Sequence, residues 1–301
     1  MSFHSQSGLA RVGPGDKVWV IAPSGSFCRD VFGQGIQVLE KSGLRPVYDD
    51  SIFSTHDYLA GHDERRLGEL RKAISDPDTK IIWCARGGYG ATRLLPNLPE
   101  VAPSKIQKLL IGFSDITALH GVWQRWGWPS LHGPNITTLA SWSAEALDAL
   151  WGWLFENQSF VLQGSPLGAQ DVYQGGVGGG NLTVLAAMCG GIWQPNFADR
   201  FVLLEDIGER PYRLDRSFTT LVQSGAFEGC KGFLVGQLTG CQEAQGPSDG
   251  GLEVLVRLIA EHFPALPILK NLPIGHEPSS YPLPFGAEVR LEGQTGLLSI
   301  G

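Results

Sequence analysis

Basic charge and paired cysteines are both scarce in this sequence. Lys and Arg number 23 against 30 Asp and Glu, which gives a net charge of −7. This acidic balance argues against a nucleic-acid-binding or anionic-membrane surface, since both require a basic footprint. The five cysteines are widely scattered and none forms a Cys-x-x-Cys pair, so neither a disulfide framework nor a structural zinc site is indicated. Free thiols persist in a reducing compartment, and we therefore expect a cytoplasmic protein.

Long apolar runs are also missing. No run approaches the roughly 20 residues that a membrane-spanning helix needs. Residues 1–14 contain no charged segment followed by an apolar one, so we expect no export signal. The 40 glycines follow no period, which is typical of many tight turns rather than of a fibrous chain. At about 150 residues per domain, 301 residues predict two domains that each bury a core.

The first part of the chain alternates between short apolar strands and helices. We expect extended segments at 18–21, 47–48, 81–84 and 109–111, and helices at 31–41, 64–73 and just after 115. Short, continuously apolar strands separated by helices are typical of parallel strands that are covered on both faces. The sequence therefore predicts a layered α/β domain over residues 1–140.

This pattern breaks after Pro134. A Trp-rich helix is expected at 144–155, and residues 163–180 are rich in Gly, Ser and Pro. We interpret 141–170 as a linker and 171–301 as a second domain. In that second domain we expect helices at 182–189, 214–223 and 252–262, and strands at 201–205, 232–238, 289–291 and 297–299.

Gly112-x-Ser114 is the most informative short motif. It lies between the apolar strand 109–111 and a predicted helix, which is the arrangement of a nucleophile elbow. In such an elbow the serine hydroxyl is exposed on a tight turn, and the next backbone N–H faces an oxyanion. Ile116 stands where α/β-hydrolases have a second glycine, so the strand and helix must pack differently here. Most Gly-x-Ser tripeptides are ordinary turns, but the strand before and the helix after favour Ser114 as a nucleophile.

A glycine loop, Arg86-Gly87-Gly88-Tyr89-Gly90, follows another apolar strand. It is not the dinucleotide fingerprint G-x-G-x-x-G, because Arg93 occupies the position of the last glycine. The loop is either a plain strand-to-helix turn or a set of oxyanion donors opposite Ser114. In the second interpretation, Arg86 is a candidate clamp for a carboxylate.

A serine nucleophile needs a base, and seven histidines are available. His120 lies about 9 Å along the helix from Ser114, too far for the hydrogen bond that a base must make. His132 closes the next strand and is one candidate. His276 is the other, because the proline-flanked segment 273–278 is irregular and can present its ring across a cleft. The residues alone leave both histidines open.

Two carboxylates, Glu205 and Asp206, end the apolar strand 201–205. The ends of parallel strands are where a sheet presents catalytic groups, although a solvated acidic strand end is equally common. Adjacent residues on a strand point to opposite faces, so one carboxylate at most can orient any single histidine. The chain order nucleophile, acid, base is that of the α/β-hydrolases.

Several separate motifs together resemble the LD-carboxypeptidases, also known as muramoyltetrapeptide carboxypeptidases. The resemblance runs in order from residue 18 to residue 285. It rests on residues 86–90, Gly112-Phe113-Ser114-Asp115, His132-Gly133-Pro134, Gly179-Gly180-Asn181-Leu182, Leu204-Glu205-Asp206 and Gly275-His276.

The resemblance implies a catalytic triad of Ser114, Glu205 and His276, with an oxyanion hole from the N–H groups of Gly88 and Asp115. It implies a flavodoxin-like, parallel-sheet N-terminal domain and a smaller, mostly β C-terminal domain, usually in a homodimer. The implied substrate is a cytoplasmic murein tetrapeptide, cut between the L-centre of its third residue and the terminal D-Ala during cell-wall recycling. No metal and no other cofactor is implied.

A carboxypeptidase must also hold the free carboxylate of its substrate, and a bidentate arginine suits that task. Arg86 is the first candidate, with Arg213 and Arg210 as alternatives. Asn181 is either an amide contact for the peptide or the N-cap of the helix that follows it.

Two other functions remain open at this point. A sister branch with the same motifs cleaves peptide–nucleotide antibiotics of the microcin C type and gives self-immunity. A non-enzymatic module of two α/β-type domains, which binds a small peptide without cutting it, is the alternative from another class.

Overall fold

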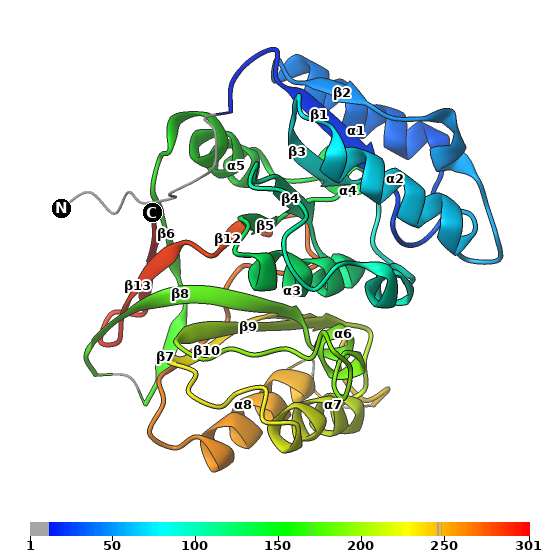
Figure 1. Cartoon of the computed structure of the whole chain (residues 1–301). Helices are drawn as coiled ribbons and strands as arrows, with labels where there is room; N and C mark the ends of the chain where they lie inside the picture. Colours follow the sequence, from blue (N-terminus) through cyan, green and yellow to red (C-terminus); the bar gives the residue numbers. More distant parts are fainter. Residues whose placement is uncertain (1–11, 169, 246, 248) are drawn as a thin grey trace.

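The computed structural model of the protein describes residues 12–168, 170–245, 247 and 249–301. Two β-sheets lie one above the other, with helix α3 (Thr117–Trp126) between them (Figure 1). We refer to them as the first sheet and the second sheet. None of the helices in the described ranges is long and apolar enough to cross a membrane.

The first sheet has six strands, and five of them are parallel. Its spatial order is β12 (Leu283–Phe285), β5 (Ser130–His132), β4 (Leu109–Gly112), β3 (Thr79–Cys84), β1 (Lys17–Ile21) and β2 (Arg45–Val47). The order β2-β1-β3-β4-β5 is the flavodoxin-like one, so the predicted fold of this part is confirmed. The edge strand β12 comes from far along the chain and is antiparallel to β5.

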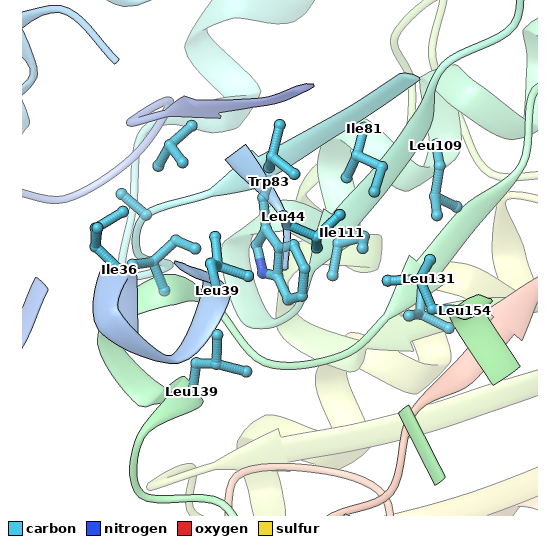
Figure 2. Close-up of a cluster of buried hydrophobic side chains, with 14 of the residues drawn as sticks. Ile36, Leu39, Leu44, Ile81, Trp83, Leu109, Ile111, Leu131, Leu139 and Leu154 are labelled. Carbon is cyan, nitrogen blue, oxygen red and sulfur yellow. The ribbon is translucent and has the colours of Figure 1, made fainter. Parts of the chain in front are cut away.

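Helices cover both faces of the first sheet. They are α1 (Arg29–Lys41), η1 (Asp50–Phe53), α2 (Asp63–Ser75), η2 (Ala91–Asn97), η3 (Ser114–Ile116), α3, α4 (Ile136–Leu139) and α5 (Ala144–Glu156). Side chains from α1, α4 and α5 pack with one face of the sheet around the fully buried Trp83 (Figure 2). Those of α2, η2 and α3 form a second cluster on the other face. Coverage on both faces explains why these strands are apolar throughout.

The segment predicted as a linker, 141–170, carries regular structure. Helix α5 contributes Leu154 to the first core, as Figure 2 shows. Strands β6 (Phe160–Gln163) and β7 (Ser165–Leu167) pair at opposite edges of the second sheet. The Trp-rich helix expected at 144–155 is thus present as α5 and packs into the first core. The division into domains 1–140 and 171–301 stays a prediction.

The second sheet has eight strands, of which β8 to β11 are parallel. Besides β6 and β7 it contains β8 (Val172–Asn181), β9 (Arg200–Ile207), β10 (Gly232–Thr239), β11 (Ile268–Lys270), β13 (Glu288–Glu292) and β14 (Leu297–Ile300). Helices α6 (Leu182–Ala187), α7 (Pro211–Gln223) and α8 (Gly250–His262) contribute to a core on one of its faces. A second mainly β unit was expected from the resemblance and is confirmed.

Strand β8 carries many of the glycines of the Gly-, Ser- and Pro-rich stretch 163–180, and close packing explains two of them. A Cβ on Gly179 would lie 2.2 Å from the carbonyl oxygen of Leu203, and one on Gly180 would lie 2.5 Å from the Thr117 hydroxyl. The glycines therefore allow β8 to lie close to β9 on one side and to α3 on the other. The backbone N–H of Asn181 donates to the Thr117 hydroxyl at 2.9 Å, which fixes α3 against the second sheet.

Candidate active site

Ser114 occupies a strained turn at the carboxyl end of β4. Its φ of +66° is in the left-handed region, which few residues other than glycine adopt. The chain reverses there from β4 into η3 and α3. Backbone strain of this kind persists only where the surroundings enforce it, and it is the geometry of a nucleophile elbow. The sequence prediction of a tight turn at Ser114 thus agrees with the backbone.

Ile116 fits this turn because Gly112 has no side chain. A Cβ on Gly112 would lie 2.9 Å from Ile116 Cγ1, 2.9 Å from Asn135 Oδ1 and 3.1 Å from Cys84 Cβ. Ile116 is fully buried beside the strand end. The departure from the hydrolase pattern is therefore accommodated by packing on the preceding glycine.

The glycine loop, residues 86–90, lies directly against the serine. A Cβ on Gly87 would be 2.9 Å from Ser114 Cβ and 3.1 Å from Ser114 Oγ. Gly88 follows with a φ of +99°. The carbonyl of Gly87 also accepts a hydrogen bond from the N–H of Gly25, at 3.0 Å, so the loop after β1 supports the loop after β3. The glycine loop thus lies beside the hydroxyl group and is itself held by the loop after β1.

Two buried charged side chains hold the glycine loop. The fully buried guanidinium of Arg66 donates to the carbonyl of Gly90 at 2.9 Å and to that of Pro23. The carboxylate of Asp115, next to the serine, accepts from the N–H of Ala91 at 2.8 Å. Burial raises the pKa of Asp115. Each contact joins the loop to a different neighbouring element, so the position of the loop is strongly determined.

Glu205 points from the second sheet toward the first. On β9, Val202 and Leu204 face the helices, whereas Phe201 and Leu203 belong to the core on the opposite face, which also contains Leu283 of β12. By this alternation Glu205 lies on the same face as Phe201 and Leu203, and it is fully buried. The alternation of strand side chains therefore aims this carboxylate between the sheets.

Asp206 faces the other way, as predicted for adjacent strand residues. Its carboxylate accepts from the Asn181 amide at 3.0 Å and from the Thr183 hydroxyl at 2.8 Å. Burial raises the pKa of Asp206, and the charge of Glu205 adds to this effect. Asp206 is thus occupied within the second unit, which leaves Glu205 as the carboxylate for a histidine.

His276 contacts Glu205. Nδ1 of the imidazole lies 2.8 Å from Oε2 of the carboxylate, a hydrogen bond between a loop and a strand. The His276 ring is also 4.8 Å from the ring of Phe113, the residue directly before Ser114. Its side chain is 10% exposed, whereas that of Glu205 is completely covered. An acid, an imidazole and a strained serine turn, far apart in the sequence, are thereby brought into one region.

Glu205 remains ionised despite its burial. Loss of solvent would raise the pKa of this carboxyl, but the imidazoles of His132 and His276 lower it to about 2. His132 is close to the carboxylate as well, with Nε2 3.8 Å from Oε1. The acid therefore carries a negative charge at neutral pH, which orients and stabilises an imidazolium.

The segment that presents His276, residues 271–282, is anchored by Gln237 of β10. The side-chain oxygen of Gln237 accepts from the N–H of Glu277 at 3.0 Å and from the Ser280 hydroxyl at 2.8 Å. A Cβ on Gly275, whose φ is +154°, would lie 2.8 Å from Gln237 Cβ. Both ends of the turn around His276 are therefore fixed to the second sheet.

The other predicted site residues make contacts outside the pair of His276 and Glu205. The Arg86 side chain is exposed and donates to the carbonyl of Ser26, on the loop after β1. Arg213 is half exposed on α7 and contacts Glu209 at 3.4 Å. The Asn181 side chain is buried and caps α6 by accepting from the N–H of Val184 at 3.1 Å, in agreement with the helix-cap alternative.

The other histidine near the serine has a structural contact. His120 Nε2 lies 2.9 Å from the carbonyl oxygen of Gly112. Burial lowers the pKa of His120 to about 3, so the ring is neutral. His120 therefore contacts the end of β4 through its ring nitrogen, and it takes no part in the hydrogen bond between His276 and Glu205.

Arg66 and Gln237 are site residues that sequence reasoning missed. Gln237 had a signal, since it is a polar residue within the otherwise apolar stretch Gly232–Leu238. Arg66 had none, because an arginine on a charged helix is usually solvated. Among the described residues, no group of three or more His, Cys, Asp and Glu side chains is arranged to hold a metal ion.

A cavity of about 540 Å³ is lined in part by residues of α3. Its lining includes His120, Gln124, Trp193 and Arg200, but none of Ser114, Glu205 and His276. The serine region and this cavity are therefore separate features of the molecule.

Family models match both parts of the chain. The model for the LD-carboxypeptidase N-terminal domain matches residues 18–133, and the model for the LD-carboxypeptidase C-terminal domain matches residues 174–291. The first match includes the serine turn and the glycine loop. The second includes Glu205 and His276.

Curated proteins and solved structures agree with these matches. The chain is 33% identical over 295 residues to the murein tetrapeptide carboxypeptidase of Pseudomonas aeruginosa, covering 92% of this chain and 93% of that protein. It is similar to the crystal structure of muramoyltetrapeptide carboxypeptidase from Oxalobacter formigenes, with a TM-score of 0.83 and 29% identity over 95% of this chain and 98% of that one.

The fold is also shared with an immunity protein. The microcin C7 self immunity protein in complex with aspartyl sulfamoyl adenosine aligns with a TM-score of 0.83, covering 97% of each chain. The sequence identity is 21%, so this likeness concerns the fold alone.

Proposed function

Because this chain belongs to the LD-carboxypeptidase family, we propose that it is a serine carboxypeptidase that releases the terminal D-Ala from murein tetrapeptides. The observation that carries the proposal is the convergence of the strained Ser114 turn with the hydrogen-bonded pair of His276 and Glu205. The carboxypeptidase names of its relatives support the choice of substrate.

In the proposed mechanism, His276 removes the proton from the Ser114 hydroxyl as this attacks the scissile carbonyl. The N–H groups of Gly88 and Asp115 hold the resulting oxyanion, a contribution of about 3 kcal/mol per donor. His276, oriented through Nδ1 by Glu205, then passes the proton to the departing amine of D-Ala. A water molecule, deprotonated by the same imidazole, hydrolyses the acyl-enzyme and restores the serine.

The free carboxylate of D-Ala needs a cationic partner, and Arg86 is the proposed one. It belongs to the glycine loop and precedes Gly88, one of the proposed oxyanion donors, by two residues. Arg213 and Arg210, at the start of α7, remain the alternatives. Truncation of the correct arginine would raise KM for the free acid and would leave the hydrolysis of a C-terminal amide analogue unchanged.

A microcin C-type peptidyl-nucleotide hydrolase is the second candidate, because the immunity protein has the same fold. The identity values, 33% and 29% for the murein carboxypeptidases against 21%, favour the murein substrate. Cytoplasmic murein recycling and a homodimeric state complete the proposal. Light scattering of the purified protein would measure the oligomeric state.

One assay tests the activity and separates the candidates. The purified protein is incubated with a murein tetrapeptide and, in parallel, with a peptidyl-adenylate, and the products are identified by mass spectrometry. We expect free D-Ala from the tetrapeptide, and a loss of at least about 10⁴-fold in kcat/KM for Ser114→Ala. Cleavage of the adenylate alone would favour the second candidate. No labelling of Ser114 by a fluorophosphonate would favour a binding module, since a binder has no activated hydroxyl.

A further inference from the structure

His132 forms a second contact with the acid of the proposed triad. It ends β5 of the first sheet and is only 2% exposed. Its Nε2 lies 3.8 Å from Oε1 of Glu205, while His276 bonds Oε2 at 2.8 Å. The carboxylate therefore stands between two imidazoles, one on each oxygen, and the His132 contact joins the first sheet to the second.

Both atoms of this contact lack a hydrogen bond. Among the described residues, His132 Nε2 and Glu205 Oε1 are buried polar atoms without a partner. Leaving such atoms unpaired destabilises a protein, and no other polar atom in the described structure satisfies them. Hydrogen bonds of this type form at about 2.7–3.2 Å, so an approach of less than about 1 Å would satisfy both atoms at once.

Apart from its contact with Glu205, His132 is surrounded by rings. Its ring packs near Phe113 at 6.0 Å and Phe285 at 5.8 Å, both apolar. The titratable groups that face this pair are His120, whose ring centroid is 6.3 Å from that of His132, and His276 on the other carboxylate oxygen. Asp206, the next residue on β9, points away toward α6.

We propose that His132 is a positioning residue, whose Nε2–H binds Oε1 of Glu205 and thereby keeps the carboxylate ionised with Oε2 on His276. The inference rests on the proposed function, since it assigns a role within the same triad. It also gives a role to both histidines that the residues alone left open, because the two imidazoles then serve one acid rather than compete for the serine. The low pKa of Glu205, about 2, agrees with two such donors.

A pair of substitutions tests this role without requiring a peptide substrate. His132→Phe keeps a ring among the neighbouring aromatic side chains but removes the donor, whereas His132→Gln retains an N–H donor. The readout is the rate at which a fluorophosphonate inactivates Ser114 as a function of pH. With His132→Phe we expect this rate to fall by about ten- to a hundredfold, the equivalent of one hydrogen bond to a charged group. His132→Gln should recover most of the loss.

The pH profile distinguishes positioning from simple packing. Without the His132 donor, the negative charge of Glu205 interacts with His276 alone. It then stabilises the protonated form of the His276 imidazole more strongly. The acid limb of the inactivation profile should therefore move to higher pH, by about one unit. As a packing control, Phe285→Leu alters the same aromatic cluster and should leave this limb in place.

Four outcomes are decisive. A displaced acid limb in His132→Phe, with recovery in His132→Gln, supports the inference. A wild-type rate and limb in His132→Phe overturns it, and so does a slower rate with an unmoved limb that His132→Gln does not improve. If the wild-type protein itself is not labelled at Ser114, the proposed function fails instead.

Discussion

The two sheets hold their reactive groups by different means. On the first sheet, Ser114 is positioned by backbone: a left-handed φ, a glycine loop pressed against its side chain, and the Arg66 and Asp115 contacts to that loop. On the second sheet, the groups are positioned by side-chain hydrogen bonds, one between His276 and Glu205 and others that the His276 loop donates to Gln237. The nucleophile therefore depends on local chain geometry, and the acid–base pair depends on long-range contacts.

This difference predicts different sensitivities. A change in the backbone environment of Ser114 moves the nucleophile relative to the oxyanion donors, and displacements of about 1 Å there reduce rates by about a hundredfold. On the second sheet, by contrast, the loss of one side-chain hydrogen bond still leaves other contacts that hold the imidazole of His276. Three sets of substitutions sharpen or break this comparison.

The largest effect is expected for Gly87→Ala. The new methyl group would lie 2.9 Å from Ser114 Cβ and 3.1 Å from its Oγ, so the turn or the loop has to shift. We expect kcat to fall by about 10²- to 10³-fold, since both the attack geometry and the oxyanion donors are displaced. Steady-state kinetics measures this loss, and circular dichroism verifies the fold.

Gly33→Ala is the matched control for that substitution. Gly33 lies within α1, and no atom is found within 4 Å of its added Cβ. Alanine is about 1 kcal/mol more favourable than glycine inside a helix, so stability should rise while activity stays unchanged. Wild-type kinetics in Gly87→Ala would contradict the idea that backbone proximity positions the serine.

Glu205→Gln probes the acid in the second sheet through stability. The folded-state pKa of Glu205, about 2, lies below the value of 4.5 for an unperturbed glutamate. Its contribution to stability is thus present above pH 4.5 and is lost as the pH falls through about 2. We expect the wild type to exceed Glu205→Gln by up to ~3 kcal/mol at neutral pH, with the difference shrinking over that range.

Asp206→Asn gives the opposite slope and serves as the comparison. Burial raises the pKa of Asp206, so ionisation of this carboxyl destabilises the folded state. The destabilisation diminishes as the pH falls and the carboxyl becomes protonated. Urea unfolding of both variants between neutral and acid pH measures the two slopes. Parallel slopes would show that the two adjacent carboxylates do not differ in the way the structure implies.

The smallest effect is expected for Gln237→Met, which keeps the length of the side chain and removes the acceptor for the His276 loop. The hydrogen bond to Glu205 remains, so we expect a loss of about tenfold in kcat with little change in KM. Ser280→Ala removes only one of the two contacts and should lose less. A loss in Gln237→Met as large as that in Gly87→Ala would remove the contrast between the two sheets.

Most of the parallel-sheet part was predictable from sequence, for a physical reason. Strands such as 81–84 and 109–111 are apolar throughout because helices cover both faces, and their ends carry recognisable turns. The packing of β8 against β9 and α3, which requires its glycines, is not visible in the sequence. Antiparallel β12 was missed because its pairing partner, β5, is about 150 residues away.

The candidate site divides in the same way. Ser114 and the glycine loop are marked by local motifs, and Glu205 by its place at a strand end. The choice between His132 and His276 depended on the resemblance, because distances between loops of different sheets are not encoded in local patterns. Arg66 and Gln237 act through contacts that only the folded chain creates.

Strand β12 has a consequence for how the chain can be divided. It follows the His276 loop directly and closes the edge of the first sheet by pairing with β5, Leu283 opposite His132. A fragment cut at the predicted domain border would expose the free N–H and C=O groups of β5, an edge that invites pairing with other copies. The short strand β12 thus covers an edge of the first sheet that would otherwise be open, and it directly follows the loop that carries His276.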